Sequence, residues 1–326
     1  MARDRLFASR RRRRRLWPWL LFLAAVPAVL LARPRSQPRS AQREVSVVRE
    51  VSFADRPAAP APPVTAQSAI LMDADTGTIL YQRDARSRRP MASTTKIMTA
   101  ILALEHARMD DWVAASKHAT ETPYTGLYLK PGERVTVRDL LWAILLRSAN
   151  DASVAMAEHV AGSEPAFIEM MNAKAQALGL KDTHFRNPHG LNDDGHYSSA
   201  YDLAQLTRYG MQYPLFAEMV GQKRKRIDRS IEKQDVVVVN KNRLLFRWDA
   251  VDGVKTGYTK QAGHCLVASA SEGEWRLIAV VLKSANSWDD SKALLQHGFR
   301  RYQRVLVAKK GTPVALVRVP NGEKQE

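Results

Sequence analysis

The order of strand-like and helix-like segments is the sequence feature that most restricts the fold. Residues 68–73 and 78–82 are short apolar segments on either side of Asp75-Thr-Gly77, a pattern typical of a β-hairpin. Strand-like segments return only in the last third of the chain, at residues 236–239, 263–271 and 275–282. Helical periodicity fills the region between these groups and follows the last strand. Strands, then helices, then strands and a closing helix predict one layered α+β domain over residues 66–305.

The helices are predicted from apolar positions that recur every three or four residues. They span residues 93–104, 137–146, 151–160, 163–178, 199–209 and 287–305. The chain is 45% hydrophobic and 25% charged, which is the composition of a folded globular protein. That balance excludes a wholly disordered chain and a polytopic membrane protein.

Most of the positive charge lies before the predicted domain. The first 43 residues hold twelve arginines and one acid, Asp4, a net charge of +11 out of +17. The other 283 residues hold 38 basic and 32 acidic side chains, a net charge of +6. An arginine cluster is also found in nucleic-acid binders. Here eight of the twelve arginines precede an uncharged apolar stretch, residues 16–32, which favours an export signal and no nucleic-acid partner.

The apolar stretch leaves two interpretations open. As a helix it spans about 25 Å, slightly short for a membrane span and long for the core of a signal peptide. Residues 1–32 are therefore predicted to be a cleaved signal peptide or a retained anchor. Residues 33–65 contain six prolines among Ala, Arg, Ser and Gln and predict an extended linker. The protein is expected in the periplasm or on the outer face of the cytoplasmic membrane.

Three short motifs occur in one order along the predicted domain. They are Ser93-Thr-Thr-Lys96, Ser148-Ala-Asn150 and Lys255-Thr-Gly257, the set typical of penicillin-binding proteins and β-lactamases. The first two are weak alone, since Ser230-Ile-Glu-Lys233 and Ser284-Ala-Asn286 also fit them. Neither copy has the other motifs in order around it, and Lys-Thr-Gly occurs once. The ordered set is therefore a strong indication of nucleophilic catalysis.

The spacing within these motifs suits an acyl transfer. Positions i and i+3 share a helix face, so Lys96 is expected beside the Ser93 hydroxyl. Burial and the neighbouring Lys255 lower the pKa of a lysine, and a neutral Lys96 can act as general base for Ser93 as nucleophile. The Ser93 N–H is placed to donate to an oxyanion, with a second donor expected after Gly257. Ser148 is predicted to pass a proton to the leaving amine.

Four further residues are predicted to bind substrate. The Asn150 amide suits a substrate carbonyl, while Lys255 and Thr256 offer a cation and a hydroxyl to a substrate carboxylate. Gly257 lets an extended substrate approach the backbone closely.

Each motif also has a purely structural explanation: a helix cap at Ser93, a solvated helix lysine at Lys96, and a turn at the third motif. Their joint occurrence in order favours catalysis.

Longer blocks around the motifs resemble a known family, the serine-type D-alanyl-D-alanine carboxypeptidases, or low-molecular-mass penicillin-binding proteins. The similar blocks are Pro90-Met-Ala-Ser-Thr-Thr-Lys-Ile-Met-Thr99, Leu127-Tyr-Leu-Lys-Pro-Gly132, Ser148-Ala-Asn-Asp-Ala-Ser-Val-Ala-Met-Ala157, Asn187-Pro-His-Gly-Leu191 and Asp252-Gly-Val-Lys-Thr-Gly-Tyr-Thr-Lys-Gln-Ala-Gly263. The resemblance implies an antiparallel sheet packed with helices and a helical subdomain. It also implies removal of the terminal D-Ala from peptidoglycan stem pentapeptides, acylation by β-lactams, and an oxyanion donor in the Tyr258 backbone.

The resemblance also leads to an expectation about the C-terminal part of the chain. Many members continue into a second, β-rich domain and an amphipathic anchor helix, whereas residues 306–326 form only a short tail here. Membrane attachment is therefore expected through residues 16–32.

Several alternatives stay open on the same residues. A DD-endopeptidase shares the whole scaffold. A β-lactamase expects Glu-x-x-Leu-Asn, and Glu169-Met-Met-Asn172 is the nearest segment. A penicillin sensor is acylated without turnover.

No His-Glu-x-x-His pair or phosphate-binding glycine loop occurs, so neither metal nor cofactor is expected. His189 is interpreted as a structural loop residue, and Cys265, the single cysteine, as a packed core thiol.

Overall fold

The computed structural model describes residues 45–50, 61–233 and 236–308, with residues 45–50 and 306–308 described by their backbone. The predicted signal or anchor at 1–32 and the tail beyond residue 308 lie outside this range. Part of the predicted linker, residues 33–44 and 51–60, lies outside it as well.

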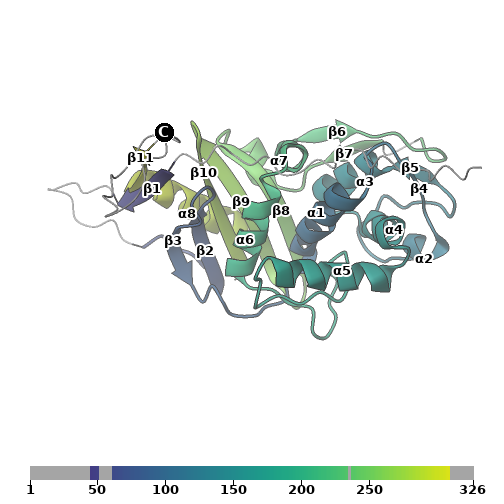
Figure 1. Ribbon diagram of the computed structural model, residues 1–326, viewed down its shortest axis with the longest axis horizontal. Coiled ribbons are helices and arrows are strands. Elements are labelled where there is room, and N and C mark those ends of the chain that lie inside the picture. The colour runs from purple at the N-terminus through teal and green to yellow at the C-terminus, as the bar shows by residue number, and fades with distance from the viewer. Residues whose placement is uncertain (1–44, 51–60, 234–235, 309–326) are drawn as a thin grey trace, which may run out of the picture. The chain divides into compact units, whose positions relative to one another are not determined.

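A five-stranded antiparallel sheet is the centre of the described fold (Figure 1). Its strands are β2 (Ser68–Asp73), β3 (Ile79–Arg83), β8 (Val251–Thr259), β9 (Gly263–Glu272) and β10 (Trp275–Ser284). They lie in the order β3-β2-β10-β9-β8, so β8 is an edge strand. The sheet joins segments about 200 residues apart, with Ile70 of β2 opposite Val280 of β10. The predicted α+β class is confirmed.

Alternate residues of the inner strands enter two separate hydrophobic cores. In β2, Ile70 and Met72 belong to one core and Ala69 and Leu71 to the other. Successive side chains of a strand point to opposite faces, so both faces of this sheet must be covered. Helix α6 (Ala200–Gly210) covers one face and α8 (Ser287–Arg301) the other, as Figure 1 shows.

The remaining helices form a cluster around α1 (Lys96–His106), which contributes nine buried residues out of eleven. The other elements of this region are η1 (Ala92–Thr95), α2 (Lys117–Thr120), α3 (Val137–Trp142), the π-helical η2 (Ala143–Arg147), α4 (Asn150–Ala161), α5 (Glu164–Ala177) and α7 (Pro214–Gly221). The short η3 (Arg243–Phe246) instead belongs to the core that contains α8. Two small antiparallel sheets pair β4 (Trp112–Ala114) with β5 (Arg134–Thr136), and β6 (Arg224–Arg226) with β7 (Val237–Val239).

Three sequence predictions differ from the structure. The closing helix ends at Arg301, and the following β11 (Tyr302–Ala308) pairs with β1 (Val45–Glu50), a strand inside the predicted linker. The valine-rich run of β1 favours a strand and outweighs the flanking prolines. The helix predicted at 137–146 changes from α to π after Trp142. No strand was predicted at residues 251–259, but the Lys-Thr-Gly motif lies inside β8, because pairing with β9 outweighs the low strand propensity of this segment.

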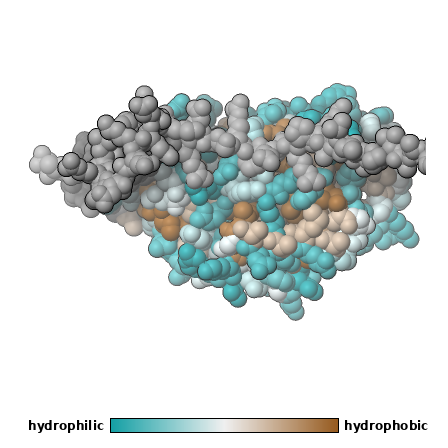
Figure 2. Space-filling model, in the orientation of Figure 1, coloured by the Kyte–Doolittle hydropathy of each residue, from teal (hydrophilic) through white to brown (hydrophobic). Residues whose placement is uncertain are grey.

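The surface seen in Figure 2 is mainly hydrophilic and carries smaller apolar areas between polar side chains. Scattered apolar residues of this kind are normal for a folded domain. None of the described helices is both long and apolar enough to cross a membrane.

Candidate active site

Ser93 lies in the short η1 helix that leads directly into α1. The hydroxyls of its two neighbours bind back to the main chain: Thr94 Oγ1 donates to Met91 O at 2.7 Å, and Thr95 Oγ1 to Ala92 O at 2.8 Å. Both threonines are fully buried, whereas Ser93 is partly exposed. The segment is thus fixed by its buried side chains, and the Ser93 hydroxyl is left accessible.

Lys96 is a buried lysine whose amine meets three oxygen atoms. Its Nζ lies 3.1 Å from Ser93 Oγ, and it donates to Asn150 Oδ1 at 2.8 Å and to the His189 carbonyl at 2.5 Å. The last two oxygens can only accept hydrogen bonds. A neutral amine has two N–H groups and one lone pair, so these acceptors take both N–H groups. The lone pair then faces the Ser93 hydroxyl, which is the geometry of a general base.

The surroundings of Lys96 favour this neutral amine. Burial lowers the pKa of Lys96 well below its usual value, and the positive charges of Lys255 and Lys241 lower it further. The carboxylate of Asp151 acts in the opposite direction. Desolvation and like charges both disfavour an ammonium group, so the site holds a lysine that can accept a proton.

Ser148 and Asn150 lie at the junction between η2 and α4. Ser148 adopts a left-handed conformation, with φ 68°, and its buried Oγ has no hydrogen-bond partner among the described residues. The Asn150 amide makes two hydrogen bonds: Oδ1 accepts from Lys96, and Nδ2 donates to the Pro123 carbonyl at 2.8 Å. Its amide therefore orients Lys96. Nδ2 carries a second N–H, so the role of Asn150 in holding a substrate carbonyl stays a prediction.

Lys255 is the cationic residue of the edge strand β8. It is 1% exposed, and its Nζ donates to the carbonyl of the partly buried Thr256 at 3.1 Å. Burial, with help from the positive charge of Lys241, lowers the pKa of Lys255 to about 7. Lys241 was not among the predicted site residues. It lies outside the three motifs, and only the fold brings it close enough to affect both buried lysines.

Gly257 also has a packing role that was not predicted. A Cβ atom at this position would lie 3.0 Å from Met91 O, 3.0 Å from Ala92 Cβ and 3.1 Å from Ser93 N. The glycine therefore lets β8 approach residues 91–95, the segment that carries the predicted nucleophile Ser93 and is called the nucleophile segment below. The predicted approach of a substrate to Gly257 stays a prediction. The next residue, Tyr258, is 59% exposed, and its ring centroid lies 4.6 Å from that of His264. Close packing at Gly257 brings the strand that carries the Tyr258 main chain next to Ser93.

The loop 187–191 is a second part of the site that the motifs did not identify. Its His189 carbonyl accepts the Lys96 hydrogen bond, and Asn187 Oδ1 accepts from the main-chain N–H groups of His189 and Gly190 at 3.3 and 2.6 Å. A Cβ on Gly190 would lie 2.0 Å from Ala92 O, so this loop is packed directly on the nucleophile segment. A main-chain carbonyl gives no signal in a sequence, although the surrounding block did support the resemblance.

Two remaining predictions concern metals and cysteine chemistry. Within the described ranges, no group of three or more His, Cys, Asp and Glu side chains is arranged to hold a metal ion. Cys265 is buried in the core, as predicted, and burial raises its pKa to about 11. A thiol with this pKa stays protonated and is a poor nucleophile.

Known proteins share both the sequence and the fold of this chain. A family model described as D-alanyl-D-alanine carboxypeptidase matches residues 55–286. D-alanyl-D-alanine carboxypeptidase DacF of Bacillus subtilis is 40% identical over 268 residues, which cover 80% of this chain and 69% of the relative. DacD of Escherichia coli K12 is 39% identical over 288 residues, covering 82% and 72%.

Solved structures are also similar to this chain in both sequence and fold. Penicillin binding protein 6B from Escherichia coli has a TM-score of 0.68 and 37% identity over 76% of this chain and 80% of its own. The Streptomyces K15 DD-transpeptidase has a TM-score of 0.71 and 31% identity over 74% of this chain and 100% of its own.

Proposed function

The chain belongs to the D-alanyl-D-alanine carboxypeptidase family and is a serine hydrolase that acts on peptidoglycan, and from this premise we propose how its own residues perform the reaction. Ser93 is the nucleophile, and the substrate is a stem pentapeptide that ends in D-Ala-D-Ala. The observation that carries the proposal is the Lys96 amine, which has two fixed acceptors for its N–H groups and Ser93 Oγ at 3.1 Å.

Acylation begins with proton transfer from Ser93 Oγ to Lys96 Nζ. The oxygen forms a bond to the carbonyl carbon of the penultimate D-Ala, and the carbonyl oxygen becomes negatively charged. The main-chain N–H groups of Ser93 and Tyr258 stabilise this oxyanion. The packing of Gly257 against Ser93 N keeps the two segments in register.

Collapse of the intermediate breaks the peptide bond to the terminal D-Ala. The departing nitrogen needs one proton, which Lys96 returns through the Ser148 hydroxyl. The buried Ser148 Oγ, without a partner among the described residues, is available for this transfer. Water then attacks the acyl-enzyme while Lys96 takes a proton from it. The ester bond to Ser93 breaks as Lys96 returns this proton to Ser93 Oγ, which releases the tetrapeptide and restores the neutral amine.

Substrate recognition uses the edge strand β8. Its outer edge has no strand partner in the described sheet, so an extended peptide can add to it by main-chain hydrogen bonds. Lys255 and Thr256 receive the terminal carboxylate, the only full charge at that end of the substrate. A β-lactam carries a carboxylate beside its reactive carbonyl, and the same contacts direct it to Ser93.

We also infer that residues 1–32 export the protein and leave it in the periplasm or on the outer face of the cytoplasmic membrane. The first 15 residues contain eight arginines, and a 17-residue uncharged stretch follows them directly. This order is typical of an export signal and supports the proposal. The N-terminal sequence of the protein recovered from an envelope fraction distinguishes a cleaved signal from a retained anchor. Recovery of the intact chain from the cytoplasm alone contradicts export.

The activity is tested by incubating the purified protein with a pentapeptide and measuring free D-Ala. We expect sustained release in wild type, none in Ser93→Ala, and normal release in Ser230→Ala, the matched control from the second Ser-x-x-Lys sequence. One equivalent of covalent label without turnover indicates a sensor. Faster cleavage of crosslinked dimers than of pentapeptides indicates an endopeptidase. Rapid hydrolysis of penicillin indicates a β-lactamase.

A further inference from the structure

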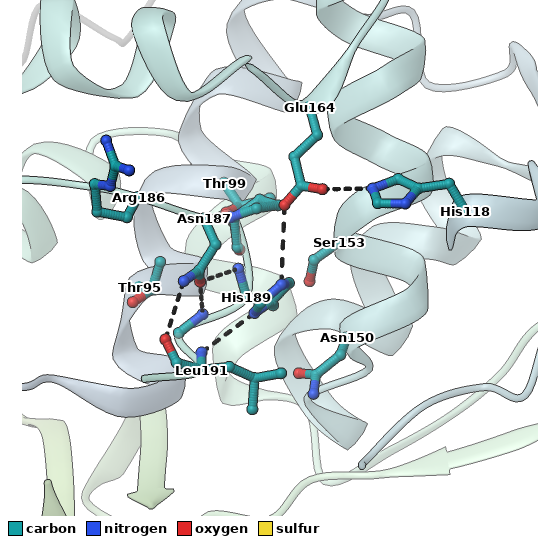
Figure 3. A network of polar contacts seen from close by, with 12 residues as sticks. Thr95, Thr99, His118, Asn150, Ser153, Glu164, Arg186, Asn187, His189 and Leu191 are labelled. Atoms are coloured by element: carbon teal, nitrogen blue, oxygen red, sulfur yellow. Dashed lines mark hydrogen bonds and ion pairs between the residues drawn. The ribbon is translucent and has the colours of Figure 1, made fainter. Parts of the chain in front are cut away.

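A chain of polar contacts links the Lys96 site to the surface of the helical cluster, and Figure 3 shows its outer part, from His189 through Glu164 to His118. It begins at the His189 carbonyl, which accepts from Lys96 Nζ at 2.5 Å. The imidazole of the same residue points to Glu164, the first residue of α5, with 3.9 Å between Nε2 and Oε1. The other carboxylate oxygen of Glu164 lies 2.7 Å from His118 Nε2 on α2. Three elements distant in sequence thus meet behind the general base.

The hydrogen bonds determine the state of the His189 ring. Leu191 N donates to His189 Nδ1 at 3.2 Å, so Nδ1 carries no proton. Burial and the nearby Lys96 lower the pKa of His189 to about 3, which keeps the ring neutral. Its one proton is therefore on Nε2 and faces the Glu164 carboxylate across 3.9 Å. This distance is too long for a hydrogen bond, so the N–H dipole is attracted to the carboxylate charge without one. The ring connects its own loop to α5, and the loop carries the carbonyl that orients Lys96.

The two outer residues differ in exposure. The Glu164 side chain is 15% exposed, whereas that of His118 is 65% exposed and in contact with the medium. The hydrogen bond to Glu164 raises the pKa of His118, and the charges of Glu164, Glu158 and Glu121 act in the same direction. These carboxylates lie on α5, on α4 and just after α2. The pair is ionic while His118 is protonated and weakens when the pH exceeds its raised pKa.

We propose that Glu164 is a positioning residue for catalysis, which fixes the His189 carbonyl on Lys96, and that His118 strengthens this support from the surface. The proposal rests on the proposed function of Lys96 as general base. If the carbonyl shifts, the lone pair of Lys96 no longer faces Ser93 Oγ. Misplacement of a reacting group by about 1 Å lowers a rate on the order of a hundredfold, so a partial loss of support is expected to cost about tenfold.

The test is the acylation of the full chain by a chromogenic penicillin, resolved into the acylation rate constant and the binding constant. Glu164→Ala is expected to lower the rate constant about tenfold and leave the binding constant unchanged. Glu164→Gln, which keeps a polar oxygen facing the His189 N–H but loses the charge, is expected to lower the rate constant less than Glu164→Ala does. The matched controls are Glu169→Ala and His159→Ala, which change exposed residues of α5 and α4. Both control variants are expected to keep the wild-type rate constant.

His118→Ala is expected to lower the rate constant less than Glu164→Ala does, and the double variant to match Glu164→Ala, because His118 acts through Glu164. The ratio of wild-type to His118→Ala rates should fall toward one as the pH rises, since the ion pair is complete only below the raised pKa of His118. A purely structural role would change stability without this pH dependence. Wild-type rate constants in both glutamate variants, additive losses, or a ratio independent of pH overturn the proposal. Acylation of wild type at Ser93 leaves the proposed function intact in each case.

Discussion

Replacement of Gly257 by alanine is the most direct perturbation of the nucleophile segment that leaves every catalytic side chain in place. The added Cβ would meet Met91 O and Ala92 Cβ at 3.0 Å and Ser93 N at 3.1 Å, whereas ordinary contacts begin at 3.4 Å. The neighbours must therefore move by about 0.4 Å, the difference between these distances. Overpacking of this kind costs about 1–3 kcal/mol of stability, and the domain is expected to remain folded.

The displaced atoms include the Ser93 nitrogen, a proposed oxyanion donor. Complete loss of one donor lowers kcat by about 10²–10³, so a displaced donor is expected to lower the acylation rate constant by about tenfold to a hundredfold. Single-turnover acylation by a chromogenic penicillin measures this constant directly.

Adding Ala92→Gly removes one of the three contacts, so the double variant should recover part of the loss. An acylation rate in Gly257→Ala within twofold of wild type would refute the packing of β8 against Ser93.

Three further predictions follow from the buried charges of the site and of the fold. The KM for a peptide with a free terminal carboxylate should rise as the pH increases through about 7, where Lys255 loses its charge; a peptide amide should show no such rise. Asn150→Ala should lower kcat about a hundredfold and change KM little, because the amide orients Lys96; steady-state kinetics on a pentapeptide separate the two constants. Glu133→Gln leaves Arg229, 2% exposed, without its charged partner and should cost about 3–5 kcal/mol of unfolding free energy in urea.

Those features of the fold that depend on local patterns could be predicted from the sequence. The hairpin predicted at 68–82 is observed as β2 and β3, and the helix predicted at 163–178 is observed at Glu164–Ala177. β8 was missed because Gly253, Lys255 and Gly257 have low strand propensity, and only its pairing with β9 makes it a strand. The pairing of β1 with β11 joins residues about 250 positions apart, a distance over which periodicity carries no information.

The contacts of the site likewise divide into those that local spacing predicts and those that only the folded chain creates. The spacing of Ser93 and Lys96 predicted their contact because i and i+3 positions share a helix face. The contacts of Asn150 with Lys96 and of Gly257 with the nucleophile segment could not be predicted, since each depends on a partner distant in sequence. His189 was interpreted as structural, and its side chain does support a loop, but its carbonyl reaches Lys96. Residue types indicate chemistry, while main-chain contacts become visible only in the folded chain.

The central claim is that Ser93 is the nucleophile, with Lys96 as its base. Mass spectrometry of the penicillin-treated protein, followed by peptide mapping, tests it most directly. We predict a single adduct on the peptide that contains Ser93, absent from Ser93→Ala and strongly reduced in Lys96→Ala. An adduct on the peptide that contains Ser148 or Ser230, or full labelling of Ser93→Ala, would contradict the claim.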